Sequence, residues 1–162
     1  MKPILLLTLL LITPYTAADE VDAERYMINE IINAKSAPEG IIFVVREYDE
    51  DALVWVLPRV EKYIQEIRHN HPKVSIAMMS HGDELASLSH DKIDEYGSMH
   101  KLLQKLVKEN QLQFHICGTM AEMSGFTVDD FPEYVDVVPF GPTQVEDYVS
   151  MDYVLVDLEL TW

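Results

Sequence analysis

Cysteine is almost absent from this 162-residue chain, which contains only Cys117. A single thiol excludes an intramolecular disulfide framework, a CxxC redox pair and a cysteine-rich zinc site. Basic residues are also scarce: 12 Lys and Arg stand against 28 Asp and Glu, for a formal net charge of -16. A surface this acidic repels phosphate backbones, so we do not expect a nucleic-acid partner.

Nucleotide-binding and hydrolase motifs are missing as well. The sequence has no GxGxxG loop, no phosphate-binding P-loop and no GxSxG elbow. It therefore gives no support for a nucleotide or for a serine hydrolase triad, and we expect no cofactor. What is present is globular composition, with 48% hydrophobic and 25% charged residues in a length typical of one domain.

Residues 1–18 have the pattern of a secretory signal peptide. Lys2 gives a positive start, residues 4–12 are almost purely apolar, and small residues follow at 16–18. The apolar run is too short for a membrane-spanning helix, which needs about 20 residues. We predict cleavage after Ala18. The mature chain, 19–162, is then one periplasmic or secreted domain with no membrane attachment.

The mature sequence alternates helical and strand patterns. Apolar residues at helical spacing predict helices over 19–37, 53–67 and 99–107, and Gly141-Pro142 can start another. Branched apolar runs or period-two alternation predict strands over 41–45, 74–79, 112–117, 135–139 and 153–160. Repeated β-α-β order predicts a single α/β domain whose central sheet is mainly parallel, with about five strands and helices on both faces.

In such sheets functional groups gather at the carboxyl ends of the strands. Tyr48, His81 and Cys117 each follow or close a predicted strand. Cys117 precedes a segment that can open a helix, and a helix N-terminus favours the thiolate. His115 lies two residues earlier on the same strand face and is a possible proton partner. The alternative is that Cys117 is a buried, inert apolar residue, as free cysteines often are.

A metal site is a further possibility at the same edge. His81, His115 and Cys117 have the ligand types of a His2Cys copper or zinc site, provided that the two strand ends converge. Sequence spacing does not fix that convergence, because no recognised ligand spacing is present. We therefore assign these three residues as candidate reactive residues and assign no metal ligands.

Three segments in order carry a family resemblance: S-H-G-D at 80–83, H-I-C-G-T-M at 115–120 and D-V-V-P-F-G-P-T-Q-V-E at 136–146. With the apolar strand at 41–45 before them, they resemble the DsrE/DsrF-like (YchN-like) family of sulfur-relay proteins, here in a secreted member. The resemblance is strongest over residues 40–156. It rests above all on the cysteine-glycine strand end and on the V-V-P-x-G motif that follows about twenty residues later.

The resemblance implies a βαβ domain that assembles into oligomers, and we expect a homo-oligomer, most simply a trimer or a hexamer. It also implies that Cys117 carries sulfur as a persulfide between a donor and an acceptor protein, in the manner of a sulfurtransferase. Many members of the wider family have no assigned activity. The alternative function is a non-catalytic binding module for a small ligand or metal at the same edge of the sheet.

Overall fold

The computed structural model describes residues 17–160, with side chains described from residue 23 onward. Five strands form one sheet in the order β4-β3-β2-β1-β5, and every neighbouring pair is parallel. The strands are β1 (Gly40–Val45), β2 (Ser75–Ser80), β3 (Leu112–Cys117), β4 (Asp136–Val138) and β5 (Tyr153–Leu158). The predicted fold class, an α/β domain with a parallel five-stranded sheet, is confirmed.

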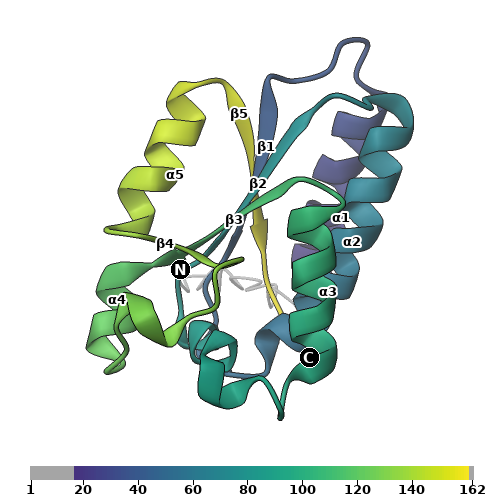
Figure 1. The fold of residues 1–162 in the computed structure, drawn as a ribbon. Coiled ribbons are helices and arrows are strands. Elements are labelled where there is room, and N and C mark those ends of the chain that lie inside the picture. The colour runs from purple at the N-terminus through teal and green to yellow at the C-terminus, as the bar shows by residue number, and fades with distance from the viewer. Residues whose placement is uncertain (1–16, 161–162) are drawn as a thin grey trace, which may run out of the picture.

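Helices cover both faces of this sheet (Figure 1). Three of them, α1 (Ala17–Asn33), α2 (Ala52–Asn70) and α3 (Gly97–Lys108), lie on one face, and α5 (Gly141–Ser150) lies on the other. Alternate residues of each strand therefore face different layers. In β1, Ile41, Phe43 and Val45 pack in the core beneath α1–α3, whereas Ile42 and Val44 pack in the smaller core beneath α5.

Burial explains why the inner strands β1 and β2 are rich in apolar residues. All six residues of β1 are buried, as are five of the six in β2, because each strand has a neighbour on both edges and helices on both faces. Full burial of one such side chain, for example Phe43, stabilises the fold by about 1.5–3 kcal/mol. The sheet is therefore a rigid platform for the loops that follow its strands.

Most predicted elements lie within a few residues of the observed ones. The largest difference is at the N-terminal helix, which ends at Asn33 rather than residue 37. Pro58 lies inside α2. The predicted signal peptide, 1–18, falls outside the described residues apart from the first two residues of α1. Among residues 17–160, no helix is both long and apolar enough to cross a membrane.

Short helical segments fill the carboxyl edge of the sheet, at the bottom of Figure 1. They are η1 (Asp83–Leu88) and η2 (His90–Lys92) after β2, and α4 (Gly118–Met123) and η3 (Val128–Asp130) after β3. Thr127 and Asp130 form a capping box at the start of η3, although this helix has only three residues. These segments surround the strand ends where the candidate residues lie.

Candidate functional site

Cys117 closes β3 beside the start of α5. Its thiol is completely buried, and its Sγ accepts a hydrogen bond from the backbone N–H of Gly141 at 3.3 Å. Gly141 is the first residue of α5, so this N–H is one of the donors that the helix itself leaves unpaired. Cys117 also immediately precedes α4. The sulfur therefore lies where a helix N-terminus points a donor at it.

The close approach to Cys117 requires glycine at position 141. A Cβ placed on Gly141 would lie 3.0 Å from Cys117 Cβ, 2.7 Å from His81 Cδ2 and 3.1 Å from Met79 Sδ. His81 and Cys117 both adjoin this one point, so the two side chains are close neighbours. The structure therefore brings together two of the three predicted site residues, under the first turn of α5.

The imidazole ring of His81 has a buried nitrogen, Nε2, that makes no hydrogen bond among the described residues. A buried ring nitrogen without a partner loses the hydrogen bonds it would make in water, which carries a free-energy cost. His81 thus offers an unused donor or acceptor beside the only thiol in the chain.

His115 shares a sheet face with Cys117, as predicted, but its ring is engaged elsewhere. Its Nδ1 lies 2.7 Å from Asp136 Oδ2 and its Nε2 lies 2.8 Å from the Tyr148 hydroxyl. That hydroxyl also donates to Gln113 Oε1 at 3.1 Å. Burial, followed by the charges of Tyr153 and Asp136, raises the pKa of Tyr148. His115 therefore joins β3, β4 and α5, and His81 is the histidine beside the thiol.

Sequence reasoning missed a buried carboxylate next to this group. Glu84 lies in η1, is fully buried, and accepts four hydrogen bonds from the ends of β1 and β2. Burial raises the pKa of Glu84, and bonds from Ser80 and from backbone N–H groups oppose that rise. No periodic pattern marks Glu84, because it follows a strand within an irregular turn. The sequence shows only that Glu84 lies four residues after Ser80, the residue whose hydroxyl it accepts.

The structure does not support two other candidates from the sequence, namely Tyr48 and the possible His2Cys metal site. Tyr48 follows β1, as expected, but its side chain is 94% exposed. Within the part of the chain that the structure describes, no three His, Cys, Asp or Glu side chains gather as a metal site would require. Both ring nitrogens of His115 already have partners. The residues present therefore do not fit the possible His2Cys metal site.

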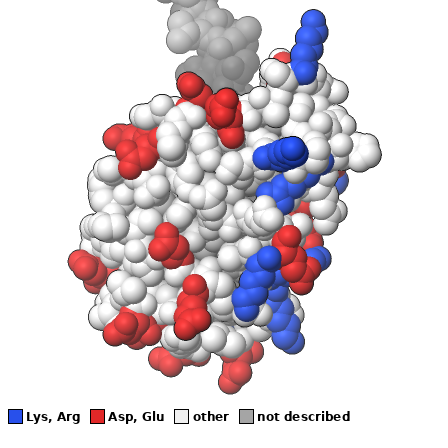
Figure 2. All heavy atoms as spheres, turned by 45° about the horizontal axis from the view of Figure 1, so that its top comes forward, with Lys and Arg blue, Asp and Glu red and all other residues white. Residues whose placement is uncertain are grey.

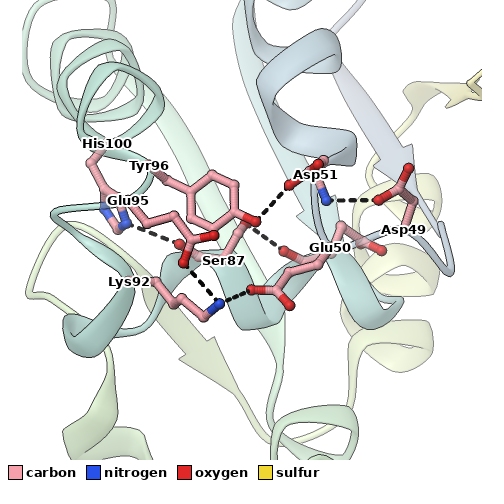
Figure 3. A network of polar contacts seen from close by, with 9 residues as sticks. Asp49, Glu50, Asp51, Ser87, Lys92, Glu95, Tyr96 and His100 are labelled. Atoms are coloured by element: carbon pink, nitrogen blue, oxygen red, sulfur yellow. Dashed lines mark hydrogen bonds and ion pairs between the residues drawn. The ribbon is translucent and has the colours of Figure 1, made fainter.

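A second polar network braces the same edge on the α3 side (Figure 3). Lys92 Nζ lies 2.7 Å from Glu50 and 3.0 Å from Glu95, and the Tyr96 hydroxyl donates to Asp51 at 2.5 Å. The hydrogen bond to Glu50 contributes most to raising the pKa of Lys92. These contacts connect the loop after β1 to the segment before α3, so the strand ends are held by loops as well as by the sheet.

Charge is unevenly distributed around the molecule. No Lys or Arg follows Lys108 in the sequence, so β4, α5 and β5 carry no cationic Lys or Arg. Figure 2 shows Lys and Arg gathered along one side, with Asp and Glu spread over the rest of the visible face. Arg46 reaches β5 from the end of β1 and pairs with Asp157 at 2.7 Å. A molecule that approaches over α5 therefore meets an acidic surface.

Comparisons with known proteins define the fold. No protein-family model matches the chain, and no curated protein matches it significantly. A solved structure, that of MTH1491 from Methanobacterium thermoautotrophicum, a protein of unknown function, matches with a TM-score of 0.59 and 20% sequence identity. The match covers 73% of this chain and 97% of that one. At this identity the likeness establishes the shared α/β architecture.

Proposed function

We propose that this chain is an exported DsrE/DsrF-like sulfur carrier that bears a persulfide on Cys117. The observation that supports it most is the Gly141 N–H donated to Cys117 Sγ at the start of α5. A thiolate or a persulfide anion at that sulfur is stabilised by the same donor and by the positive end of the helix dipole, which contributes about 0.3–1 kcal/mol.

The transfer step needs no external oxidant. The Cys117 thiolate attacks the terminal sulfur of a donor persulfide, R–S–S–H, and a new S–S bond forms as the donor S–S bond breaks. The electron pair of the broken bond leaves with R–S⁻, and the proton stays on the transferred sulfur. We assign the removal of the thiol proton beforehand to His81, which adjoins Gly141 as Cys117 does. His115 keeps α5 in position through Tyr148.

Burial of the thiol sets a condition on this function. Because Cys117 is completely covered, a donor reaches it only when the neighbourhood of His81 and Gly141 opens. Both residues lie in loops or at a helix end, the parts of a fold that open locally at the lowest free-energy cost. Loading is therefore slower than for an exposed thiol, and the loaded persulfide is shielded from water.

A second function uses the same neighbourhood without covalent chemistry. The unpartnered Nε2 of His81 favours a small polar ligand that enters beside Gly141 and supplies the missing hydrogen bond. In that case Cys117 stays buried and lines the space that the ligand occupies. The two functions differ in whether the sulfur of Cys117 acquires mass.

The deciding experiment is the intact mass of the purified mature protein after exposure to inorganic polysulfide. We expect an added mass of one or more sulfur atoms that dithiothreitol removes, and no addition to the Cys117→Ser variant. Since Cys117 is the sole cysteine, the unfolded wild-type protein serves as the positive control for labelling. A folded wild-type protein that gains no sulfur while its unfolded form does would favour the binding module.

Export and assembly belong to the same proposal. We propose that the mature N-terminus is Asp19, which sequencing of protein recovered from the producing cell identifies directly. We also propose a homo-oligomer that exchanges sulfur with a donor or acceptor protein. Two side chains of α1 that the domain leaves exposed support contact with another copy, namely Tyr26 (66%) and Met27 (40%).

A further inference from the structure

The carboxylate of Glu84 is surrounded by donors from both neighbouring strand ends. Its Oε1 accepts the Ser80 hydroxyl at 2.8 Å and the backbone N–H groups of His81 and Gly82, each at 2.9 Å. Its Oε2 accepts the backbone N–H of Glu47 at 2.8 Å. All four donors are uncharged, and the side chain is fully buried. Such an arrangement fixes backbone positions, because each lost bond leaves a buried group unsatisfied.

The turn formed by His81, Gly82 and Asp83 is held by further backbone hydrogen bonds and by a close approach at Gly82. The His81 N–H also lies 3.0 Å from the Val45 carbonyl, and the Asp83 N–H donates to the Glu47 carbonyl at 2.7 Å. At Gly82 a Cβ would lie 2.3 Å from both the Glu47 carbonyl oxygen and Glu84 Oε2. The turn therefore closes tightly around the carboxylate, and its geometry sets where the His81 side chain starts.

From that turn, His81 reaches the first residue of α5, and Cys117 adjoins the same residue. We propose that Glu84 is a positioning residue that holds His81 over Cys117 and so sets how readily a reagent or sulfur donor reaches the thiol. The significance for sulfur transfer rests on the proposed function, whereas the effect on thiol access does not. Among the described residues, no hydrogen bond joins the Glu84 carboxylate to the sulfur of Cys117.

The test measures the rate at which the native protein reacts with 4,4′-dithiodipyridine, which reports Cys117 alone because it is the sole cysteine. In Glu84→Gln, one acceptor oxygen becomes an amide NH2 group, which is a donor and faces other donors. We expect its thiol to react roughly tenfold faster or more than that of wild type, a rate change that corresponds to the loss of one or two hydrogen bonds. Ser80→Ala, which removes one donor, should give a smaller increase in the same direction and serves if Glu84→Gln fails to fold.

Glu24→Gln is the matched control. Glu24 is also a buried glutamate (7% exposed), but it accepts a hydrogen bond from the Tyr63 hydroxyl and forms an ion pair with Arg59, on the face of the sheet opposite α5. Its substitution should change the thiol rate only as far as it changes global stability. Low urea separates the two cases, because local opening exposes little surface and responds weakly to denaturant, whereas global unfolding responds steeply.

A double-mutant comparison tests the path through His81. His81→Ala alone should speed the reaction, because removal of the covering ring outweighs removal of a proton acceptor. Glu84→Gln should add little in that background, since the group that it positions is gone. An equal acceleration by Glu84→Gln with and without His81, or rates that merely follow global stability, would overturn the proposal. If the accessibility effect appears but polysulfide adds no sulfur, the sulfur-carrier function fails and the positioning role of Glu84 stands.

Discussion

The backbone N–H of Gly141 and the sulfur of Cys117 are joined by a 3.3 Å hydrogen bond between residues 24 positions apart. This contact fastens the start of α5 to the end of β3. The first position of this helix is a glycine, where a side chain would crowd Cys117 Cβ and the ring of His81. The candidate site therefore depends on a backbone group that no side-chain motif describes.

Gly141→Ala should both destabilise the fold and expose the thiol. The added methyl group would lie 2.7 Å from His81 Cδ2 and 3.0 Å from Cys117 Cβ, so a neighbour must move. Overpacking of this kind costs about 1–3 kcal/mol. We expect a lower urea midpoint together with faster reaction of Cys117 in the native state.

Gly97→Ala is the control for that substitution. Gly97 starts α3, and a Cβ there would meet no atom within 4 Å. Alanine has a higher helix propensity than glycine, so this variant should be as stable as wild type or slightly more stable. Equal destabilisation by the two substitutions would show that the close approach at Gly141 has no energetic consequence.

Tyr148→Phe tests whether His115 acts through α5. The hydroxyl of Tyr148 links His115 Nε2 to Gln113, and its removal leaves the buried Nε2 of His115 without that partner. We expect a loss of about 1–3 kcal/mol in the free energy of unfolding, measured by urea denaturation. The effect of polysulfide on the mass of the folded variant should persist. Complete loss of loading in a folded Tyr148→Phe protein would place this network in the transfer chemistry.

His100 should make stability depend on pH near neutrality. Burial is the largest cause that lowers the pKa of His100 from its ordinary 6.5, and its Nε2 lies 3.0 Å from the Ser87 carbonyl. Above 6.5 the stability contribution of the neutral ring is fully present, and it is lost as the pH falls through the lower pKa of the folded state.

Urea denaturation at a series of pH values measures that loss. The free energy of unfolding of wild type should fall more steeply with acidification than that of His100→Asn. His69→Asn provides the control, because the side chain of His69 is exposed and its substitution disturbs no buried contact. Parallel curves for wild type and His100→Asn would contradict the assignment.

The proposed homo-oligomer should dissociate more readily at low salt. Asp and Glu outnumber Lys and Arg by more than two to one, and the repulsion between copies is screened within about 8 Å at physiological ionic strength. Sedimentation velocity across a salt series should show a shift toward smaller species as salt is removed. A monomer at high protein concentration and moderate salt would contradict the proposed assembly.

Local sequence patterns predicted the layers of this fold because strand and helix periodicity record which faces are buried. A branched apolar run marked β1, and period-two alternation placed His115 and Cys117 on one face of β3. The order of strands in the sheet, with β5 beside β1, could not be predicted in this way. It depends on contacts between segments more than a hundred residues apart.

The site was predicted only in part, for the same reason. The carboxyl-edge rule brought His81 and Cys117 together without fixing their geometry. Tyr148 takes the ring of His115 for its own hydrogen bond, and Glu84 turns inward from an irregular segment. Both effects come from tertiary packing, which periodicity does not record. The complete burial of Cys117 likewise depends on where α5 begins.

The central claim, that Cys117 carries transferable sulfur, is tested most directly by cyanolysis of the polysulfide-treated, folded and desalted protein. Cyanide removes the outer sulfur of a persulfide, so that Cys–S–S⁻ and CN⁻ give Cys–S⁻ and SCN⁻. We predict thiocyanate in proportion to the amount of wild-type protein, with recovery of the original mass, and none from Cys117→Ser. Wild-type protein that releases no more thiocyanate than Cys117→Ser would contradict the account.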